Sequence, residues 1–266
     1  MEIESFIKQC SMLDGFLTLT DHTYAVQEFA MNYRAVEAVA LEMGIIPLRY
    51  QRNQSTISLQ QQKILFNSHI AIIGCGGLGG HIAEILTRIG IGKLSLYDFD
   101  HFEEHNLNRQ NFSTVVDLGR DKAIVVKEAL ERINPSIEID AWVQRFDPHS
   151  DLDSIKGLTL IIDALDDPQI KLDLAQQCKT KHIHCVHGAI AGMHGQFTTD
   201  STLEHLYPDG SRGAELSSGN PSFTVTLAAS IQASEAIKCI LGIGETLQGK
   251  FMVADLLYND FEKFPL

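Results

Sequence analysis

Paired cysteines are missing from this sequence. Its five cysteines are an odd and scattered set in which no two form a CxxC pair: Cys10, Cys75, Cys178, Cys185 and Cys239. A small secreted fold would need a disulfide framework, and a four-cysteine zinc site would need two CxxC pairs. The sequence therefore predicts neither a disulfide framework nor a zinc site.

Long apolar runs, N-terminal basic residues and an excess of positive charge are also missing. No run approaches the roughly 20 apolar residues that a membrane helix needs. The opening MEIESFIKQC carries acids where a signal peptide carries bases. The 21 lysines and arginines are outnumbered by 34 acidic residues, which gives a formal net charge of −13. Because nucleic-acid binding needs a basic face, we expect no nucleic-acid partner. Since neither a membrane helix nor a signal peptide is predicted, we expect a cytoplasmic protein with no membrane partner.

Residues 1–48 predict a small helical N-terminal extension. Apolar residues recur at roughly helical spacing over 25–43, which predicts one helix there. Thr20 and Asp21 are candidate caps before it, and a glycine and a proline just beyond it would end it. Such a helix would serve packing or dimer contacts, or alternatively grip a partner.

From residue 69 onward, predicted strands alternate with predicted helices. We expect strands at 69–73, 93–98, 137–142, 157–165 and 183–190, and helices at 80–89, 122–133, 170–179 and 224–241. GQFTT and GKFMVADLL predict further strands around the last helix, and 200–221, rich in Ser, Gly and Pro, predicts a mobile crossover loop. The predicted fold is α/β: a Rossmann-like, doubly wound, mainly parallel sheet with antiparallel C-terminal strands, in a domain of residues 49–266.

A glycine-rich loop, IIGCGGLGG, follows the first of these strands. Gly74, Gly76 and Gly79 match G-x-G-x-x-G between a strand and a helix. Glycines let the backbone turn tightly and let its N–H groups approach phosphate. Asp98, nineteen residues after Gly79 at the end of the next strand, is placed to bind ribose hydroxyls. The loop predicts nucleotide binding, but the glycines alone fit NAD as well as ATP.

A polar arm after Asp98 favours ATP over NAD. A dehydrogenase normally continues into another helix here, whereas this chain reads DFDHFEEHNLNRQNFS and then DLGRDKA. Asn106, Arg109 and Gln110 form a polar cluster, and Lys122 stands at the start of the next helix. Arginine and lysine beside a polyphosphate neutralise the charge that builds during attack on the α-phosphate. Hydride transfer has no such demand.

Three acids, Asp163, Asp166 and Asp167, cluster after the predicted strand at 157–165. They lie at the carboxyl edge of the sheet, where α/β proteins bind ligands. Mg²⁺ favours one or two carboxylates together with phosphate oxygens, so Asp166 is a candidate ligand. The alternative for Asp163 and Asp167 is an acidic turn in which Asp167 and Pro168 open a helix.

The combination of motifs resembles the ThiF/MoeB/HesA family, the bacterial relatives of ubiquitin-activating enzymes. The resemblance runs from about Leu48 to the C-terminus. It rests on RYQRN (49–53), GCGGLG, DFD (98–100), NLNRQ (106–110), GRDKA (119–123), DALDD (163–167), GMHGQF (192–197) and SIQASEAIK (230–238).

The resemblance implies an enzyme that binds ATP and Mg²⁺ and adenylates the C-terminal carboxylate of a small carrier protein or peptide, releasing pyrophosphate. It implies Arg52, Arg109, Lys122 and Asp166 as catalytic residues, with Asp166 also holding the magnesium. The implied nucleotide contacts are Gly74, Gly76, Gly77, Gly79, Asp98, Asp100, Asn106 and Gln110. Arg52 would reach the ATP site of the other subunit, which makes a homodimer part of the mechanism.

Two features usual in that family are missing. The zinc-binding CxxC pairs are absent, and so is the cysteine that would take the activated carrier as a thioester. Its expected place lies between Gly213 and Ser222, where the sequence has Glu215, Ser217 and Ser218. A seryl ester is one alternative. The simpler hypothesis is that catalysis stops at the acyl-adenylate and that an outside sulfur donor or amine accepts the acyl group.

The stretch HIHCVHG is a further candidate site. Strand alternation predicts His182 and His184 on one face, and Cys185 with His187 on the other. A metal site or a nucleophile is one reading, but a buried cysteine beside partnered histidines is the more ordinary one. Cys75, inside the glycine loop, is expected to pack as a small apolar residue.

The leading hypothesis is an adenylyltransferase that activates a sulfur-carrier or ubiquitin-like protein. The nearest rival is nucleotidylation of a microcin-type peptide, with the N-terminal extension gripping the peptide. An NAD-linked oxidoreductase would leave Arg109 and Lys122 idle, and a catalytically silent scaffold would not need Asp166 beside them.

Overall fold

A computed structural model describes residues 2–12, 15–201, 203, 207 and 218–266. Eight strands form one large sheet in the order β10-β9-β8-β7-β6-β3-β4-β5. The five strands from β7 to β5 run parallel, while β8, β9 and β10 are antiparallel. The predicted fold class is therefore confirmed. The strands are β3 (His69–Ile73), β4 (Lys93–Tyr97), β5 (Glu138–Trp142), β6 (Leu160–Asp163), β7 (His184–Ala191), β8 (His194–Thr199), β9 (Lys250–Asp255) and β10 (Asp260–Pro265).

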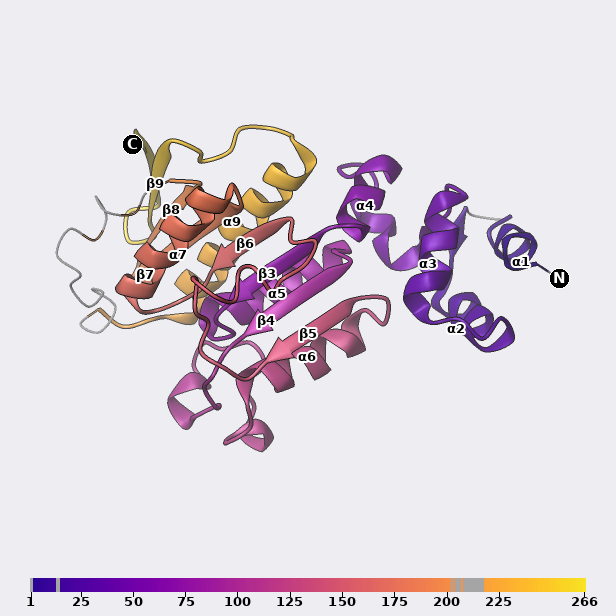
Figure 1. The fold of residues 1–266 in the computed structure, drawn as a ribbon, viewed down its shortest axis with the longest axis horizontal. Coiled ribbons are helices and arrows are strands. Elements are labelled where there is room, and N and C mark those ends of the chain that lie inside the picture. The colour runs from indigo at the N-terminus through magenta and orange to yellow at the C-terminus, as the bar shows by residue number, and fades with distance from the viewer. Residues whose placement is uncertain (1, 13–14, 202, 204–206, 208–217) are drawn as a thin grey trace.

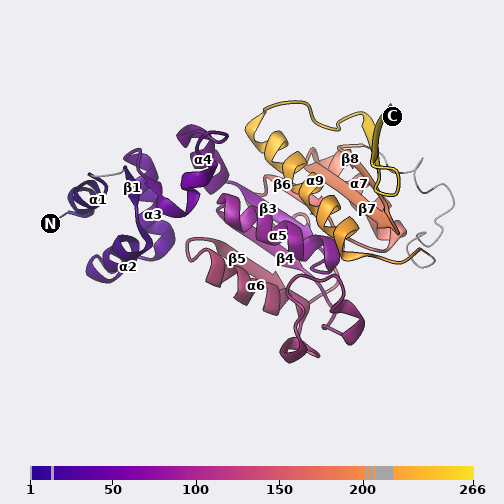
Figure 2. The same cartoon turned by 180° about the vertical axis from the view of Figure 1, so that it is seen from behind.

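The central strands are buried along their whole length because helices or loops cover both faces of the sheet. Every residue of β3 and β6 is buried. Even-numbered side chains such as Ile70 and Ile72 join the larger core, while Ala71 and Ile73 join the core on the other face. Helices α5 (Gly77–Ile89), α6 (Lys122–Ile133) and α9 (Ser222–Leu241) cover the first face, and α7 (Pro168–Lys181) covers the second (Figures 1 and 2).

The N-terminal extension contains more helices than predicted. The prediction of a single helix over 25–43 is wrong. The chain forms α1 (Ile3–Cys10), α2 (Leu19–Glu28) and α3 (Tyr33–Glu42), with a two-stranded parallel sheet of β1 (Phe16–Leu17) and β2 (Ile46–Pro47). The break has a local cause: Ala30 adopts a positive φ of 50°, and the Asn32 side chain caps α3 by accepting from the Ala35 N–H. Apolar spacing continues across the break because both helices bury residues in the same small core.

Two short elements, both missed at the sequence level, join the extension to the sheet. They are η1 (Leu48–Asn53), a 3-10 helix, and α4 (Leu59–Phe66), which starts with a reciprocal capping box between Ser58 and Gln61. Arg34 of α3 donates to the carbonyl oxygens of Gly92 (2.6 Å) and Phe66 (3.2 Å). The extension is thus attached to the amino-terminal edge of β4.

Within the described part of the chain, no helix is both long and apolar enough to cross a bilayer. Most of the predicted crossover loop at 200–221 lies outside the described residues, so its predicted mobility stays a prediction.

Candidate nucleotide site

The glycine loop lies at the point where the strand order reverses. Strand β3 sits between β4 and β6, so the loop that follows it meets the loop that follows β6 at the carboxyl edge of the sheet. Open α/β sheets bind their ligands at this switch point. Helix α5 begins at Gly77, three residues earlier than predicted, and no side chain caps its N-terminus. Its first N–H groups are therefore available to an anion.

Two of the loop glycines, Gly74 and Gly79, are required by the chain itself. A Cβ atom added to Gly79 would lie 1.8 Å from the carbonyl oxygen of Gly74. Gly74 has a φ of +98°, and a Cβ atom added to it would lie 2.6 Å from the carbonyl oxygen of Ala164. Gly76 and Gly77 differ. A Cβ on Gly76 would meet only the Gln110 amide, at 3.5 Å, and one on Gly77 would meet Val225 at 3.2 Å and Arg109 at 3.7 Å. No backbone packing demands glycine at these two positions, which is the arrangement expected where a ligand approaches the main chain.

Asp98 supports the loop directly. Its carboxylate accepts from the Cys75 N–H (2.7 Å) and from the Asp100 N–H (2.8 Å). Burial raises the pKa of Asp98, although these two donors and the nearby Lys122 ammonium act in the opposite direction. Each carboxylate oxygen keeps a second acceptor position, so the loop contacts leave room for a ribose hydroxyl.

Lys122 lies beside the turn that follows β4. Its ammonium nitrogen is 3.2 Å from the Asp100 carboxylate, and its backbone N–H donates to the Asp100 carbonyl oxygen (3.0 Å). The side chain is only 7% exposed, and its charge also acts on Asp98 and Cys75. The structure therefore holds a buried cation next to the glycine loop.

The polar arm folds back over the same loop. Gln110 and the aliphatic stem of Arg109 are the side chains nearest to Gly76 and Gly77, apart from Val225. The Arg109 guanidinium donates to the His105 carbonyl oxygen (2.9 Å) and to Asn108 (2.8 Å). The Gln110 amide oxygen is buried without a partner among the described residues. An arginine and an unsatisfied acceptor thus border the open side of the loop.

Asn106 lies at the end of a short helix within the polar arm, and its nucleotide contact stays a prediction. It is 2% exposed, and its side-chain oxygen accepts from the Glu103 N–H (2.9 Å) at the start of the short 3-10 helix η2 (Glu104–Asn106). This contact shapes the arm that carries Arg109. A second short 3-10 helix, η3 (Val115–Asp117), leads toward α6.

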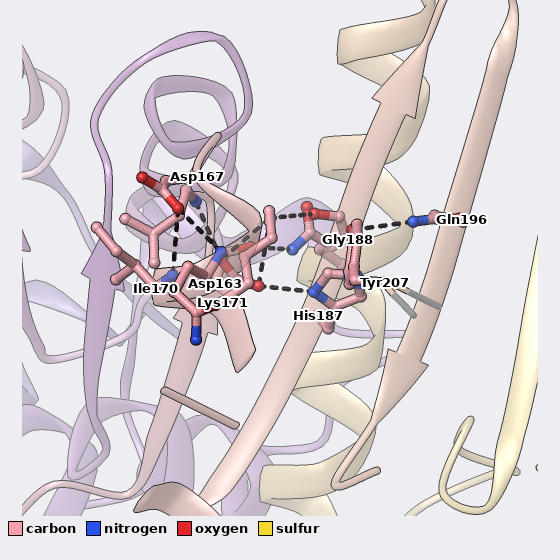
Figure 3. A network of polar contacts seen from close by, with 11 residues as sticks. Asp163, Asp167, Ile170, Lys171, His187, Gly188, Gln196 and Tyr207 are labelled. Atoms are coloured by element: carbon pink, nitrogen blue, oxygen red, sulfur yellow. Dashed lines mark hydrogen bonds and ion pairs between the residues drawn. The ribbon is translucent and has the colours of Figure 1, made fainter. Parts of the chain in front are cut away.

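The three clustered acids separate into distinct roles, and Figure 3 shows two of them, Asp163 and Asp167. Asp163 is buried and paired with Lys171 and His187, and Asp167 caps α7 by accepting from the N–H groups of Gln169 and Ile170. The predicted helix-opening role is thus confirmed for Asp167, whereas Asp163 is a buried residue of β6 and not part of an acidic turn. Asp166 lies between them, exposed, and among the described residues it has no hydrogen-bond or ion-pair partner. It remains the one acid of the three with an available carboxylate.

Arg52 lies far from the glycine loop of its own chain. It is an exposed residue of η1, two positions after Tyr50, whose ring packs against Gly90 at the C-terminal end of α5. The glycine loop lies at the N-terminal end of that helix, and 13 residues of α-helix span about 20 Å. The structure therefore does not bring Arg52 to this loop.

The HIHCVHG stretch is structural in the described part of the chain. Strand β7 begins at His184, so the expectation that His182 shares its face is wrong: His182 adopts a left-handed conformation as the cap of α7. His184 pairs with Asp200, and Cys185 is buried, as the ordinary reading expects. Cys75 also packs in the main core. No group of three or more potential metal ligands occurs among the residues that the structure describes.

Sequence reasoning missed Lys171 and His187 as partners of Asp163. A signal for the first was available: Lys171, Leu174 and Cys178 share one face of α7, and a lysine in an apolar stripe indicates a buried acid nearby. Of the candidates for a covalent acceptor, Glu215 and Ser217 lie outside the described residues. Ser218 packs against Gly192 at the turn between β7 and β8.

Comparison with known proteins gives consistent results. The model of the ThiF family matches residues 50–266. Molybdopterin-synthase adenylyltransferase of Salmonella typhimurium is 28% identical over 230 residues, which cover 82% of this chain and 92% of the relative. Sulfur carrier protein adenylyltransferase of Thermus thermophilus is 26% identical, with 81% and 85% covered. A crystal structure of E. coli MccB with ATP has the same fold, with a TM-score of 0.70 at 21% identity, covering 92% of this chain and 82% of that one.

Proposed function

Because the chain belongs to the ThiF family, we propose that it is an adenylyltransferase that activates the C-terminal carboxylate of a small sulfur-carrier or ubiquitin-like protein. In the reaction a carboxylate oxygen attacks the α-phosphorus of ATP. The bond from that phosphorus to the bridging oxygen breaks, and pyrophosphate leaves with the electron pair. The products are an acyl-adenylate and pyrophosphate.

One observation carries this proposal: positive groups lie near the glycine loop that follows β3. The uncapped N-terminus of α5, the Arg109 stem against Gly77 and the buried Lys122 ammonium all lie at the switch point of the sheet. The attacking group belongs to the substrate, so the enzyme needs no nucleophile for this step. Its own residues align the phosphates and neutralise the charge that builds on them.

Asp166 fits a magnesium ligand, since it is an exposed carboxylate at the carboxyl edge of the sheet and has no partner among the described residues. Bound there with phosphate oxygens, Mg²⁺ would offset negative charge on the triphosphate. Asp98 would hold the ribose while its contact with the Cys75 N–H keeps the loop in shape.

A homodimer is part of the proposal. The distance of η1 from the glycine loop of the same chain leaves Arg52 free to serve the loop of a second copy. We also propose the division into residues 1–48 and 49–266, which the separate small core of the extension supports. The lack of a cysteine between Gly213 and Ser222 supports a reaction that stops at the acyl-adenylate, with an outside acceptor.

The test is carrier-dependent exchange of labelled pyrophosphate into ATP. We expect exchange with the wild-type protein and its loss in Arg109→Ala and Lys122→Met. Titration with NAD serves as the control for the oxidoreductase alternative. Binding of NAD in preference to ATP, or exchange that survives both substitutions, would overturn the proposal.

The second candidate is nucleotidylation of a short peptide. It is favoured by the extension, which buries its own core yet leaves Leu19 (56%) and Tyr24 (51%) exposed. The variant Leu19→Ser with Tyr24→Ser removes apolar surface without touching the contacts of Arg34 to the sheet. Loss of peptide binding with unchanged ATP binding would favour this candidate over the carrier-protein reading.

A further inference from the structure

A buried carboxylate, Asp163, ends strand β6 and is held by donors on several sides (Figure 3). The Lys171 ammonium lies 3.2 Å from one of its oxygens and 3.3 Å from the other. His187 Nδ1 lies 2.6 Å from Oδ2, and the Leu165 N–H donates to Oδ1 at 3.0 Å. On the opposite face, the Gln232 amide donates to the Asp163 backbone carbonyl (2.9 Å). The end of β6 is therefore fixed from both faces of the sheet.

The charges in this network determine which atoms carry protons. Burial alone would raise the pKa of Asp163, but Lys171 and the His187 hydrogen bond outweigh it, so the pKa is lowered and the carboxyl is ionised. Burial lowers the pKa of His187, so its imidazole is neutral at pH 7. An ionised carboxylate only accepts, and the His187 proton therefore sits on Nδ1.

This tautomer sets the direction of a longer chain of hydrogen bonds. With its proton on Nδ1, His187 offers Nε2 as an acceptor, and the Tyr207 hydroxyl lies 3.4 Å away. That hydroxyl donates to His187 and accepts from the Gln196 amide of β8, at 2.9 Å. Hydrogen-bond donation thus runs from Gln196 through Tyr207 and His187 to Asp163. In each of these hydrogen bonds a donor faces an acceptor.

The segment that carries Asp166 is attached to this network on one side and to helix α7 on the other. Leu165, just before Asp166, is tied to Asp163, and Asp167, just after it, caps α7. The carbonyl oxygen of Ala164 packs against Gly74 of the glycine loop. In the part of the chain that the structure describes, Asp166 has no hydrogen-bond or ion-pair partner, so the position of its carboxylate depends on the residues at either side.

We propose that His187 is a positioning residue: its Nδ1–H bond to Asp163 fixes the β6–α7 segment so that Asp166 faces the nucleotide phosphates. This inference rests on the proposed function and names a residue that acts through Asp163 without touching substrate. Asp166 lies three residues beyond the end of β6, and His187 lies within β7, 21 positions further along the sequence. Only the pairing of β6 with β7 brings Asp163 opposite His187.

Two substitutions of His187 separate this role from a general packing role. In His187→Asn the amide nitrogen takes the place of Nδ1 and keeps the donor to Asp163. In His187→Gln the amide takes the place of Nε2, so the contact toward Tyr207 is kept and the donor to Asp163 is lost. Both variants are polar and smaller than or similar in size to histidine, so they make a matched pair.

The measurement is equilibrium binding of Mn²⁺ by electron paramagnetic resonance, in the presence of a non-hydrolysable ATP analogue. We expect His187→Gln to weaken Mn²⁺ binding about tenfold, at the lower end of what loss of a supporting contact behind a metal ligand costs. His187→Asn should weaken it less than about threefold. Asp166→Asn is the reference, and adding His187→Gln to it should weaken binding no further.

Equal Mn²⁺ binding by the two His187 variants, or a larger loss in His187→Asn, would overturn the inference. So would additive losses in the double variant. Failure of the proposed function has a different signature, because it would show as wild-type protein that binds the analogue and Mn²⁺ but gives no carrier-dependent pyrophosphate exchange.

Discussion

A Cβ atom built on Gly79 would lie 1.8 Å from the carbonyl oxygen of Gly74, closer than any side chain can be accommodated. The first turn of α5 therefore rests directly on the loop that precedes it. A Cβ atom built on Gly77 would meet only side-chain atoms, the nearest of them at 3.2 Å. Gly79 is thus required by backbone packing, whereas Gly77 is not. Substitutions at the two positions should therefore have different effects.

Gly79→Ala should destabilise the fold, and Gly77→Ala should weaken nucleotide binding in a folded protein. The first change forces backbone to move, at about 3 kcal/mol or more. The second places a methyl group where phosphate oxygens would approach the N-terminus of α5, and we expect about a tenfold loss of ATP affinity by calorimetry. Val225→Ala is the control, since it relieves the 3.2 Å contact. Affinity restored in Gly77→Ala with Val225→Ala would assign the loss to packing instead.

Arg52→Ala and Arg109→Ala should complement each other when the two variants are mixed as unfolded chains and refolded together. If Arg52 serves the partner's site, each mixed dimer contains one site with both arginines, and random pairing restores about a quarter of wild-type pyrophosphate exchange. Each variant refolded alone is the control. No recovery in the mixture would mean that Arg52 acts within its own chain or not at all.

The ion pair between Glu37 and Arg49 should contribute strongly to the attachment of the extension. Glu37 is fully buried and contacts the Arg49 guanidinium, which also donates to Ser136 at 2.7 Å. Glu37→Ala leaves a partly buried arginine without its counter-charge, which costs about 2 kcal/mol or more. The double variant Glu37→Met with Arg49→Met should be more stable than Glu37→Ala in urea unfolding. A double variant that is less stable would contradict this account.

Acidification should destabilise the extension through His22. This residue is fully buried, and its Nε2–H donates to the Tyr33 carbonyl oxygen at 2.8 Å. Burial lowers the pKa of His22 from 6.5 to about 4. Between these values the unfolded chain binds a proton that the folded chain excludes, so stability falls as the pH falls from 6.5 toward 4.

The expected loss between pH 7 and pH 5 is about 2 kcal/mol in the free energy of unfolding. His22→Gln keeps a donor for Tyr33 and cannot titrate, so the difference between the two proteins isolates this residue. Urea unfolding of both at the two pH values gives the measurement. Equal pH dependence in the two proteins would show that His22 is not the group responsible.

Local patterns in the sequence determined the fold class and the place of the glycine loop. The buried strand HIAII, the glycines after it and the alternation of strands with helices each depend on residues close together in the chain, and all were predicted correctly in kind. Boundaries were less accurate, because helical spacing can continue through a turn: α2 and α3 share one apolar stripe across the Asn32 cap.

Only the tertiary structure decided what each acid near the switch point does. Asp163, Asp166 and Asp167 are equivalent as letters in DALDD, yet Asp163 is paired with Lys171 and His187 and Asp167 caps a helix. Asp166 is exposed and has no partner among the described residues. These outcomes depend on the register of β6 with β7 and on the face of α7 that is buried. Such contacts join residues that no local period relates, because burial and charge pairing act through space while sequence patterns report only neighbours along the chain.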